Sequence, residues 1–175
     1  MEYAGYGIYW TKESSEAQIL ADAVWLYDFI TTEYGFNESD IILFGRSIGS
    51  GPATYVASVW NPSVLILMSP FKSIKEVVKG LMGRMIKWLV AEWFDNLKHM
   101  ESVKCPVMFI HGLGDDLIAR HHSEDLHAKV ANISQIIIHD EMDHNNFDFH
   151  EHLVDPVKEF MKKLGIFTNK NLELK

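Results

Sequence analysis

Short apolar runs alternate with amphipathic segments along this sequence. The runs cover 41–44, 64–68, 107–110 and 133–138, and the first three contain no polar residue. Uninterrupted apolar runs of this length are typical of strands buried on both faces of a sheet. Because segments with helical spacing separate them, the pattern predicts an α/β fold with a parallel sheet of about four strands and flanking helices.

Four helices are predicted before, between and after these strands. The first begins at Ser15, where S-x-x-Q forms a capping-box pattern, and ends before the glycine of Tyr34-Gly35. The other three are predicted over the ranges 52–58, 122–130 and 149–164.

The segment 71–100 differs from the rest of the chain. Between Ser73 and Phe94, apolar residues surround most of a predicted helix instead of forming one stripe. We interpret 71–100 as a helical, cap-like insertion in a single domain that spans 1–168. The polar segment 169–175 is predicted to be a tail.

The first apolar run leads into Gly45-Arg46-Ser47-Ile48-Gly49, which fits the pattern G-x-S-x-G. In this pattern a strand turns sharply into a helix, and the serine hydroxyl is exposed at the corner. Both glycines are expected to be needed because a side chain would collide as the chain reverses. We interpret Ser47 as a nucleophile and the Ile48 N–H, at the helix start, as an oxyanion donor. The alternative is an ordinary turn, since Gly and Ser are common in turns.

An acid and a histidine follow the third and fourth runs. Asp115 and Asp116 come after the third strand, and we choose Asp115 as the acid that orients the base, leaving Asp116 to cap the next turn. His144 lies several residues past the fourth strand and could act as general base, whereas His139 is too close to the strand end. The order of serine, acid and histidine is the one that accompanies G-x-S-x-G. The alternative for His144 is a solvated loop residue.

Histidines also cluster in two segments of the chain, and each cluster must be considered as a possible metal site. His144, Asp148, His150 and His152 form one group, and the segment 121–127 holds three more histidines. Neither group has a familiar metal-ligand spacing, so we assign no metal site and no cofactor.

Composition narrows the choice of partners. The chain has 175 residues with 47% hydrophobic and 23% charged residues, as expected for one globular domain. Its formal net charge of −8, without a basic cluster, argues against nucleic acid and against electrostatic binding to anionic membranes. No signal peptide or long apolar run is present, so we expect an intracellular protein, either cytoplasmic or peripheral to membranes. The single Cys105 is expected to be a buried, reduced thiol.

Several motifs together resemble one family. They are Tyr3-Ala4-Gly5-Tyr6-Gly7, Ser15-Glu16 with Asp22-Ala23, the stretch 44–52, Ser69-Pro70, Trp93-Phe94-Asp95, Cys105-Pro106-Val107, Ile110-His111-Gly112 with Asp115, and His144. In this order they resemble the alpha/beta hydrolase domain-containing protein 17 group, which is close to the Bem46-like hydrolases. The resemblance runs from Tyr3 to Met161.

The resemblance implies the alpha/beta hydrolase fold and a serine hydrolase with Ser47, Asp115 and His144 as catalytic residues. It also implies acyl-ester or acyl-thioester substrates, including S-palmitoylated proteins, since the group removes palmitate from cysteines. Arg46, Met82, Met85, Trp88 and Trp93 are candidate substrate-binding residues, and packing under the cap is an equal alternative for the Met and Trp side chains.

The sequence departs from the group in three ways. Arg46 stands where the group often has glutamine, and the group's N-terminal cysteine cluster is absent. The first half of the hydrolase sheet, with the loop that gives a second oxyanion N–H, has no counterpart here. We therefore expect an unpaired edge at Ile41–Phe44 that favours self-association or a partner, and weak hydrolysis by the chain alone. The alternative hypothesis is that the chain is a catalytically weak or inactive, hydrolase-derived interaction module.

Overall fold

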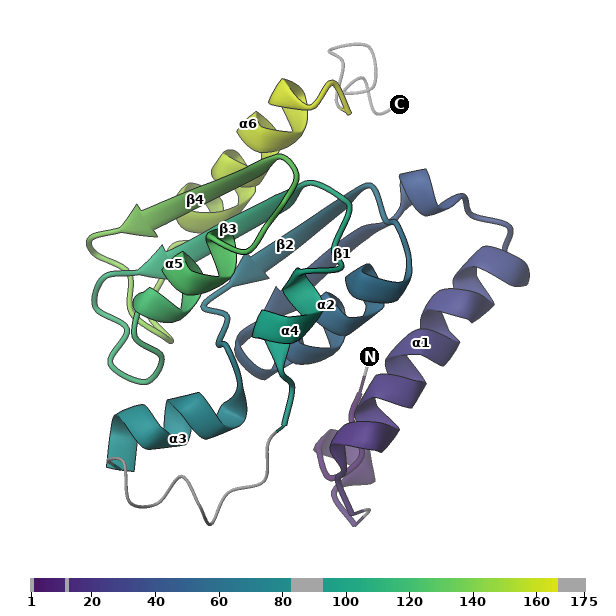
Figure 1. Cartoon of the computed structure of the whole chain (residues 1–175), viewed down its shortest axis with the longest axis horizontal. Coiled ribbons are helices and arrows are strands. Elements are labelled where there is room, and N and C mark those ends of the chain that lie inside the picture. Colours follow the sequence, from purple (N-terminus) through teal and green to yellow (C-terminus); the bar gives the residue numbers. More distant parts are fainter. Residues whose placement is uncertain (1, 12, 83–92, 167–175) are drawn as a thin grey trace.

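The computed structural model describes residues 2–11, 13–82 and 93–166. Within them, four strands form one parallel sheet in the order β1-β2-β3-β4. The strands are β1 (Ile42–Arg46), β2 (Val64–Met68), β3 (Val107–Gly112) and β4 (Ser134–His139). All four run in the same direction, so their carboxyl ends lie along one rim, at the left of Figure 1. The predicted α/β fold is confirmed.

In the described part of the chain, six α-helices accompany the sheet: α1 (Glu16–Thr32), α2 (Ser50–Val59), α3 (Ile74–Met82), α4 (Asn96–Met100), α5 (His121–His127) and α6 (Asp155–Lys163). The first begins as predicted, because the Ser15 hydroxyl accepts the Gln18 N–H at 3.2 Å. The Gln18 side chain does not complete the capping box and donates instead to Asp22. The predicted helix over 149–164 is a π-helical turn, His150–Val154, followed by α6.

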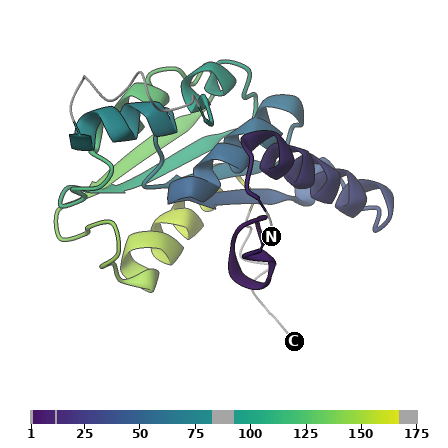
Figure 2. The same cartoon turned by 90° about the horizontal axis from the view of Figure 1, so that it is seen from below.

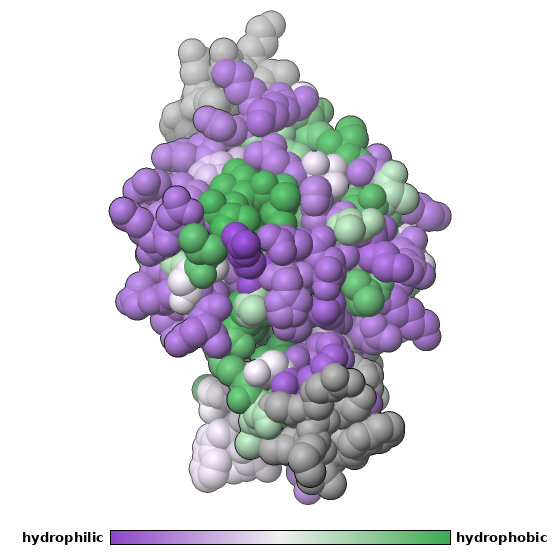
Figure 3. Space-filling model, turned by 60° about the vertical axis from the view of Figure 1, so that its left-hand side comes forward, coloured by the Kyte–Doolittle hydropathy of each residue, from purple (hydrophilic) through white to green (hydrophobic). Residues whose placement is uncertain are grey.

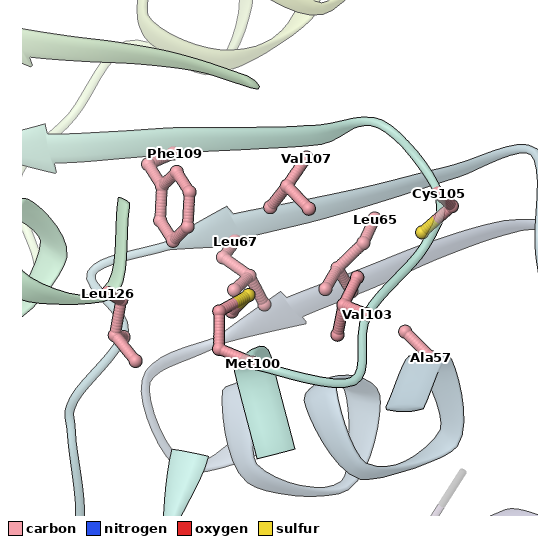
Figure 4. Close-up of a cluster of buried hydrophobic side chains, with 9 residues drawn as sticks. All are labelled: Ala57, Leu65, Leu67, Met100, Val103, Cys105, Val107, Phe109 and Leu126. Carbon is pink, nitrogen blue, oxygen red and sulfur yellow. The ribbon is translucent and has the colours of Figure 1, made fainter. Parts of the chain in front are cut away.

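One face of the sheet packs on α2, α4 and α5. The side chains in Figure 4 form this core: Leu65 and Leu67 from β2 and Val107 and Phe109 from β3 lie against helix and loop residues such as Met100 and Leu126. These residues are all at most 3% exposed. Burial of this kind supplies about 1.5–3 kcal/mol for each large side chain. This layer holds the strands that carry the candidate site at a fixed spacing.

The other face packs on α6, which Figure 2 shows on the opposite side of the sheet from α5. Here Val64, Ile66 and Met68 alternate with the residues of the first core, and they meet Met108, Ile110 and Phe160. All five residues of β2 are therefore buried, as the uninterrupted apolar run predicted.

Strand β1 departs from the prediction of burial on both faces. Leu43 is half-buried and packs against the first core, but Ile42 and Phe44 are 40% and 49% exposed. Within the described residues, β1 has a neighbouring strand on one side only. A run of four apolar residues cannot distinguish a central strand from this edge strand, because side-chain type does not report how many neighbours a strand has.

The predicted cap-like insertion is only partly described. Residues 74–82 form α3 and 96–100 form α4, whereas 83–92 lie outside the described residues, as does the predicted tail at 169–175. No helix in the described ranges is both long enough and apolar enough to cross a membrane.

The open edge of β1 borders an apolar groove of about 270 Å³. Leu26, Tyr27 and Ile30 of α1 line one side, and Pro52 and Ala53 of α2 line another. An exposed edge with unpaired backbone groups and apolar side chains is a template for pairing with another strand.

We therefore expect the purified chain to self-associate through β1. Light scattering should give a mass above the 20.1 kDa of one chain, and Phe44→Lys should lower it, because a charge on an edge strand opposes pairing. Trp25→Lys is the matched control, since Trp25 is an exposed aromatic residue on α1 and does not line the groove. A monomeric wild-type chain, or equal effects of the two variants, would contradict this interface.

Candidate active site

Ser47 lies at the sharp corner between β1 and α2. Its backbone has φ of +51°, a left-handed conformation that few residues other than glycine adopt. Close packing holds this corner: a Cβ on Gly45 would lie 2.6 Å from the Gly49 carbonyl oxygen, and one on Gly51 would lie 2.4 Å from the Phe94 ring. A Cβ on Gly49 would meet only the Tyr3 hydroxyl, at 3.7 Å. The predicted steric need for glycine therefore holds at Gly45 and is absent at Gly49.

The structure brings the three predicted residues together, although they are far apart in sequence. The His144 Nε2 lies 3.0 Å from the Ser47 Oγ, and the His144 Nδ1 lies 2.8 Å from the Asp115 Oδ2. Asp115 and His144 are 5% and 8% exposed. Because Nδ1–H donates to the carboxylate, Nε2 is left to accept a hydrogen bond from the serine hydroxyl.

Asp115 is fixed on both of its oxygens. Its Oδ1 accepts the N–H groups of Leu117 and Ile118 at 3.1 and 2.8 Å, so Asp115 itself caps the turn. The prediction that Asp116 does so is wrong, and Asp116 is exposed. Sequence order cannot decide between two adjacent acids, because either can reach N–H groups two or three residues ahead.

A buried histidine supports the carboxylate. His111, which is fully buried at the end of β3, has its Nε2 2.7 Å from the Ile118 carbonyl and 3.5 Å from the Asp115 Oδ2. A carbonyl can only accept, so Nε2 carries the proton of the neutral ring, and Nδ1 accepts from the Ser123 hydroxyl at 2.6 Å. Burial raises the pKa of Asp115, but hydrogen bonds from His111, the Ile118 N–H and His144 outweigh it and hold that pKa well below its usual range.

The loop after β4 that carries His144 is anchored at two points. The Met142 side chain is fully buried in the core beneath α6, and its carbonyl accepts the Gly114 N–H at 3.0 Å. A Cβ on Gly112 would lie 2.0 Å from that same carbonyl oxygen, so glycine is required there. Asp143 then accepts the N–H groups of Asn145 and Asn146 at 2.8 and 2.7 Å, which closes a tight turn around His144.

No family model matches this chain. Alpha/beta hydrolase domain-containing protein aho-3 of Caenorhabditis elegans is 28% identical over 160 residues, covering 91% of this chain and 47% of the relative. Alpha/beta hydrolase domain-containing protein 17C of Homo sapiens is 27% identical with the same coverage. An acetyl xylan esterase from Paenibacillus sp. R4 superposes with a TM-score of 0.68 at 16% identity, over 83% of this chain and 52% of the esterase.

The chain has the alpha/beta hydrolase fold. It resembles the alpha/beta hydrolase domain-containing protein 17 group, as the sequence motifs predicted. It spans about half the length of the curated relatives that it matches. The proteins it resembles are named as hydrolases and esterases.

The other predicted site residues of this alpha/beta hydrolase fold lie in different surroundings. Ile48 follows Ser47 in the short helix η3 (Ser47–Gly49), at a helix start where N–H groups have no partner within the helix. Met82 is the exposed last residue of α3, and Trp93 is half-buried beside Phe94 in a third apolar cluster. Met85 and Trp88 lie outside the described residues. Arg46 contacts the loop that carries His144.

Figure 3 turns the left-hand side of Figure 1 forward, the side where the strands end, and shows apolar patches among polar side chains. Leu113 and Leu117 flank Asp115 in sequence and are 48% and 43% exposed. Among the described residues, no group of three or more His, Cys, Asp or Glu is placed to hold a metal ion.

Sequence reasoning assigned no role to His111 or Asp143. His111 lies within the noted motif Ile110-His111-Gly112 and Asp143 directly precedes His144, and both support a predicted site residue from one to four positions away. A signal was available for Asp143, because an Asp side chain commonly accepts the backbone N–H two residues ahead in a turn. None was available for His111, since its partners Ser123 and Ile118 lie on separate turns of the chain.

The burial of His122, at the start of α5, can be tested through its effect on stability at different pH values. It is 3% exposed, its Nδ1 accepts the Lys72 N–H at 3.2 Å, and it stacks on His121 at 4.5 Å. Burial, then the neighbouring His121 and Lys72, lower the pKa of His122 to about 4.

We expect the free energy of unfolding to fall as the pH drops from about 6.5 to about 4. Over this window the unfolded chain binds a proton at His122 that the folded chain rejects. His122→Asn retains an acceptor near Nδ1 but cannot be protonated, so its pH profile should be flatter. Urea unfolding at several pH values measures this, and parallel profiles for the two proteins would contradict it.

Proposed function

We propose that this chain is a serine hydrolase that cleaves acyl esters or thioesters. The observation that carries the proposal is the continuous hydrogen-bonded line from the Ser47 Oγ through His144 to Asp115, with distances of 3.0 and 2.8 Å. The left-handed corner at Ser47 adds support, because it presents the hydroxyl at the rim of the sheet.

In the proposed reaction, the Ser47 Oγ attacks the acyl carbonyl while His144 Nε2 takes the hydroxyl proton. Asp115 accepts the Nδ1–H bond and stabilises the imidazolium that forms. The Ile48 N–H donates to the oxyanion of the tetrahedral intermediate. His144 then gives its proton to the leaving oxygen or sulfur, and a water molecule activated by the same histidine releases the acid from Ser47.

The substrate class follows from two considerations. The family resemblance favours acyl thioesters, including palmitate on protein cysteines, and the exposed Leu113 and Leu117 offer apolar surface near Asp115. A thiolate is a better leaving group than an alkoxide, so hydrolysis of a thioester needs less stabilisation of the oxyanion.

A second candidate is a hydrolase-derived interaction module with little activity. The observation that favours it is the open edge of β1 with exposed Ile42 and Phe44. Covalent labelling with a fluorophosphonate separates the two, since only an activated serine reacts.

Ser47→Ala should abolish fluorophosphonate labelling and lower hydrolysis of a short acyl thioester by up to about 10⁶-fold, as loss of the nucleophile does in other triads. The fold should persist, because the change removes one oxygen at a corner held by its neighbours; circular dichroism checks this. Turnover by the variant equal to that of the wild type would refute the assignment.

Asp115→Asn should lower kcat/KM by about 10⁴-fold, because the amide favours the wrong tautomer of His144. Its Oδ1 can still accept the Leu117 and Ile118 N–H groups, so the turn should survive. Asp116→Asn makes the same change at an exposed neighbour and should have little effect. The reverse ranking in steady-state kinetics would transfer the role to Asp116.

A further inference from the structure

Arg46 is the last residue of β1 and directly precedes Ser47. Side chains alternate along a strand, and Gly45 faces α2, so Arg46 faces the opposite side of the sheet. There it meets the loop after β4. Its Nη2 donates to the His144 carbonyl and to the Asn145 Oδ1, the latter at 3.3 Å. The guanidinium also lies 5.2 Å from the centre of the Phe147 ring.

We infer that Arg46 is a positioning residue that fixes the loop carrying His144 against the strand carrying Ser47. This inference rests on the proposed function, since it concerns the contact between the proposed nucleophile and base. Arg46 acts through the backbone of His144 and not on the substrate, which distinguishes it from the substrate-binding role expected from the sequence.

The need for such a contact follows from the other anchors of the loop. Asp115 fixes the His144 ring, and Met142 ties the loop to the segment after β3. The Asp143 bonds lie within the turn itself. None of these contacts reaches β1. Arg46, which directly precedes the nucleophile in the sequence, joins the turn to that strand.

The chemistry of arginine suits this role. Its rigid, planar group can donate to two acceptors at once and still lie against an aromatic ring. Its Nε is buried and has no hydrogen-bond partner within the described residues. Loss of water from a charged group is unfavourable. This cost opposes the placement of the side chain, so the contacts with the His144 carbonyl, Asn145 and the Phe147 ring must outweigh it.

Arg46→Met tests the inference because methionine keeps an unbranched chain without donors or charge. A shift of about 1 Å between reacting groups can cost about 100-fold, so we expect a fall of that order in kcat and in the rate of fluorophosphonate labelling, with KM unchanged. Arg46→Lys keeps the charge without the paired donors and should give an intermediate rate. Phe44→Met, on the same strand and face, is the matched control and should match the wild type.

A second measurement reads the position of His144 without turnover. The Nδ1–H proton shared with Asp115 should give a downfield proton NMR signal, identified by its loss in His144→Gln. In Arg46→Met this signal should broaden through exchange with water. Normal labelling of Arg46→Met, or an unchanged signal in it, would overturn the inference.

The two proposals fail in different ways. If the wild-type chain does not label at all, the proposed function fails, and the NMR signal alone decides the role of Arg46: broadening in Arg46→Met supports it, and no change overturns it. If the wild type labels and Arg46→Met slows no more than Phe44→Met, the proposed function stands and the positioning role fails.

Discussion

The left-handed backbone at Ser47 is the constraint on which the rest of the structure depends. A non-glycine residue in this conformation costs about 1–3 kcal/mol, so the surrounding structure must hold it. Gly45 and Gly51 let α2 and Phe94 approach the corner closely, and β1 is paired to β2 along its length. Packing of the first core then keeps α2 against the sheet. The exposed hydroxyl is thus a product of close packing around it.

The parallel sheet converts distant positions in the sequence into neighbours. β1, β3 and β4 end at the same rim, and each is followed by a segment that supplies one of Ser47, Asp115 and His144. The buried β2 supplies no member of the hydrogen-bonded line and acts as the spacer between β1 and β3. Asp115 connects two of these segments. One of its oxygens accepts a hydrogen bond within its own turn, and the other accepts a hydrogen bond from His144.

The four strands, the helices that flank them and the three residues that meet at the rim could be predicted from the sequence. The strands were predicted from short apolar runs and Ser47 from the spacing of its glycines, since both are local properties of the sequence. The exposure of Ile42 and Phe44 was not predictable, because it depends on which strands flank β1. Neither was the capping by Asp115, nor the contact of Arg46 with the loop 98 residues away. These depend on long-range packing that residue type alone does not encode.

The meeting of Gly112 with the Met142 carbonyl bears on how the site can move. There is no room for a methyl group between them, and the Gly114 N–H also donates to the Met142 carbonyl, so the turn after β3 and the loop after β4 are joined through their backbones. Acid and base are therefore joined by these backbone contacts, and Arg46 and the sheet join them to the strand that carries the serine. Thermal fluctuations at the rim would therefore break the hydrogen bond between Ser47 and His144 more readily than the hydrogen bond between His144 and Asp115.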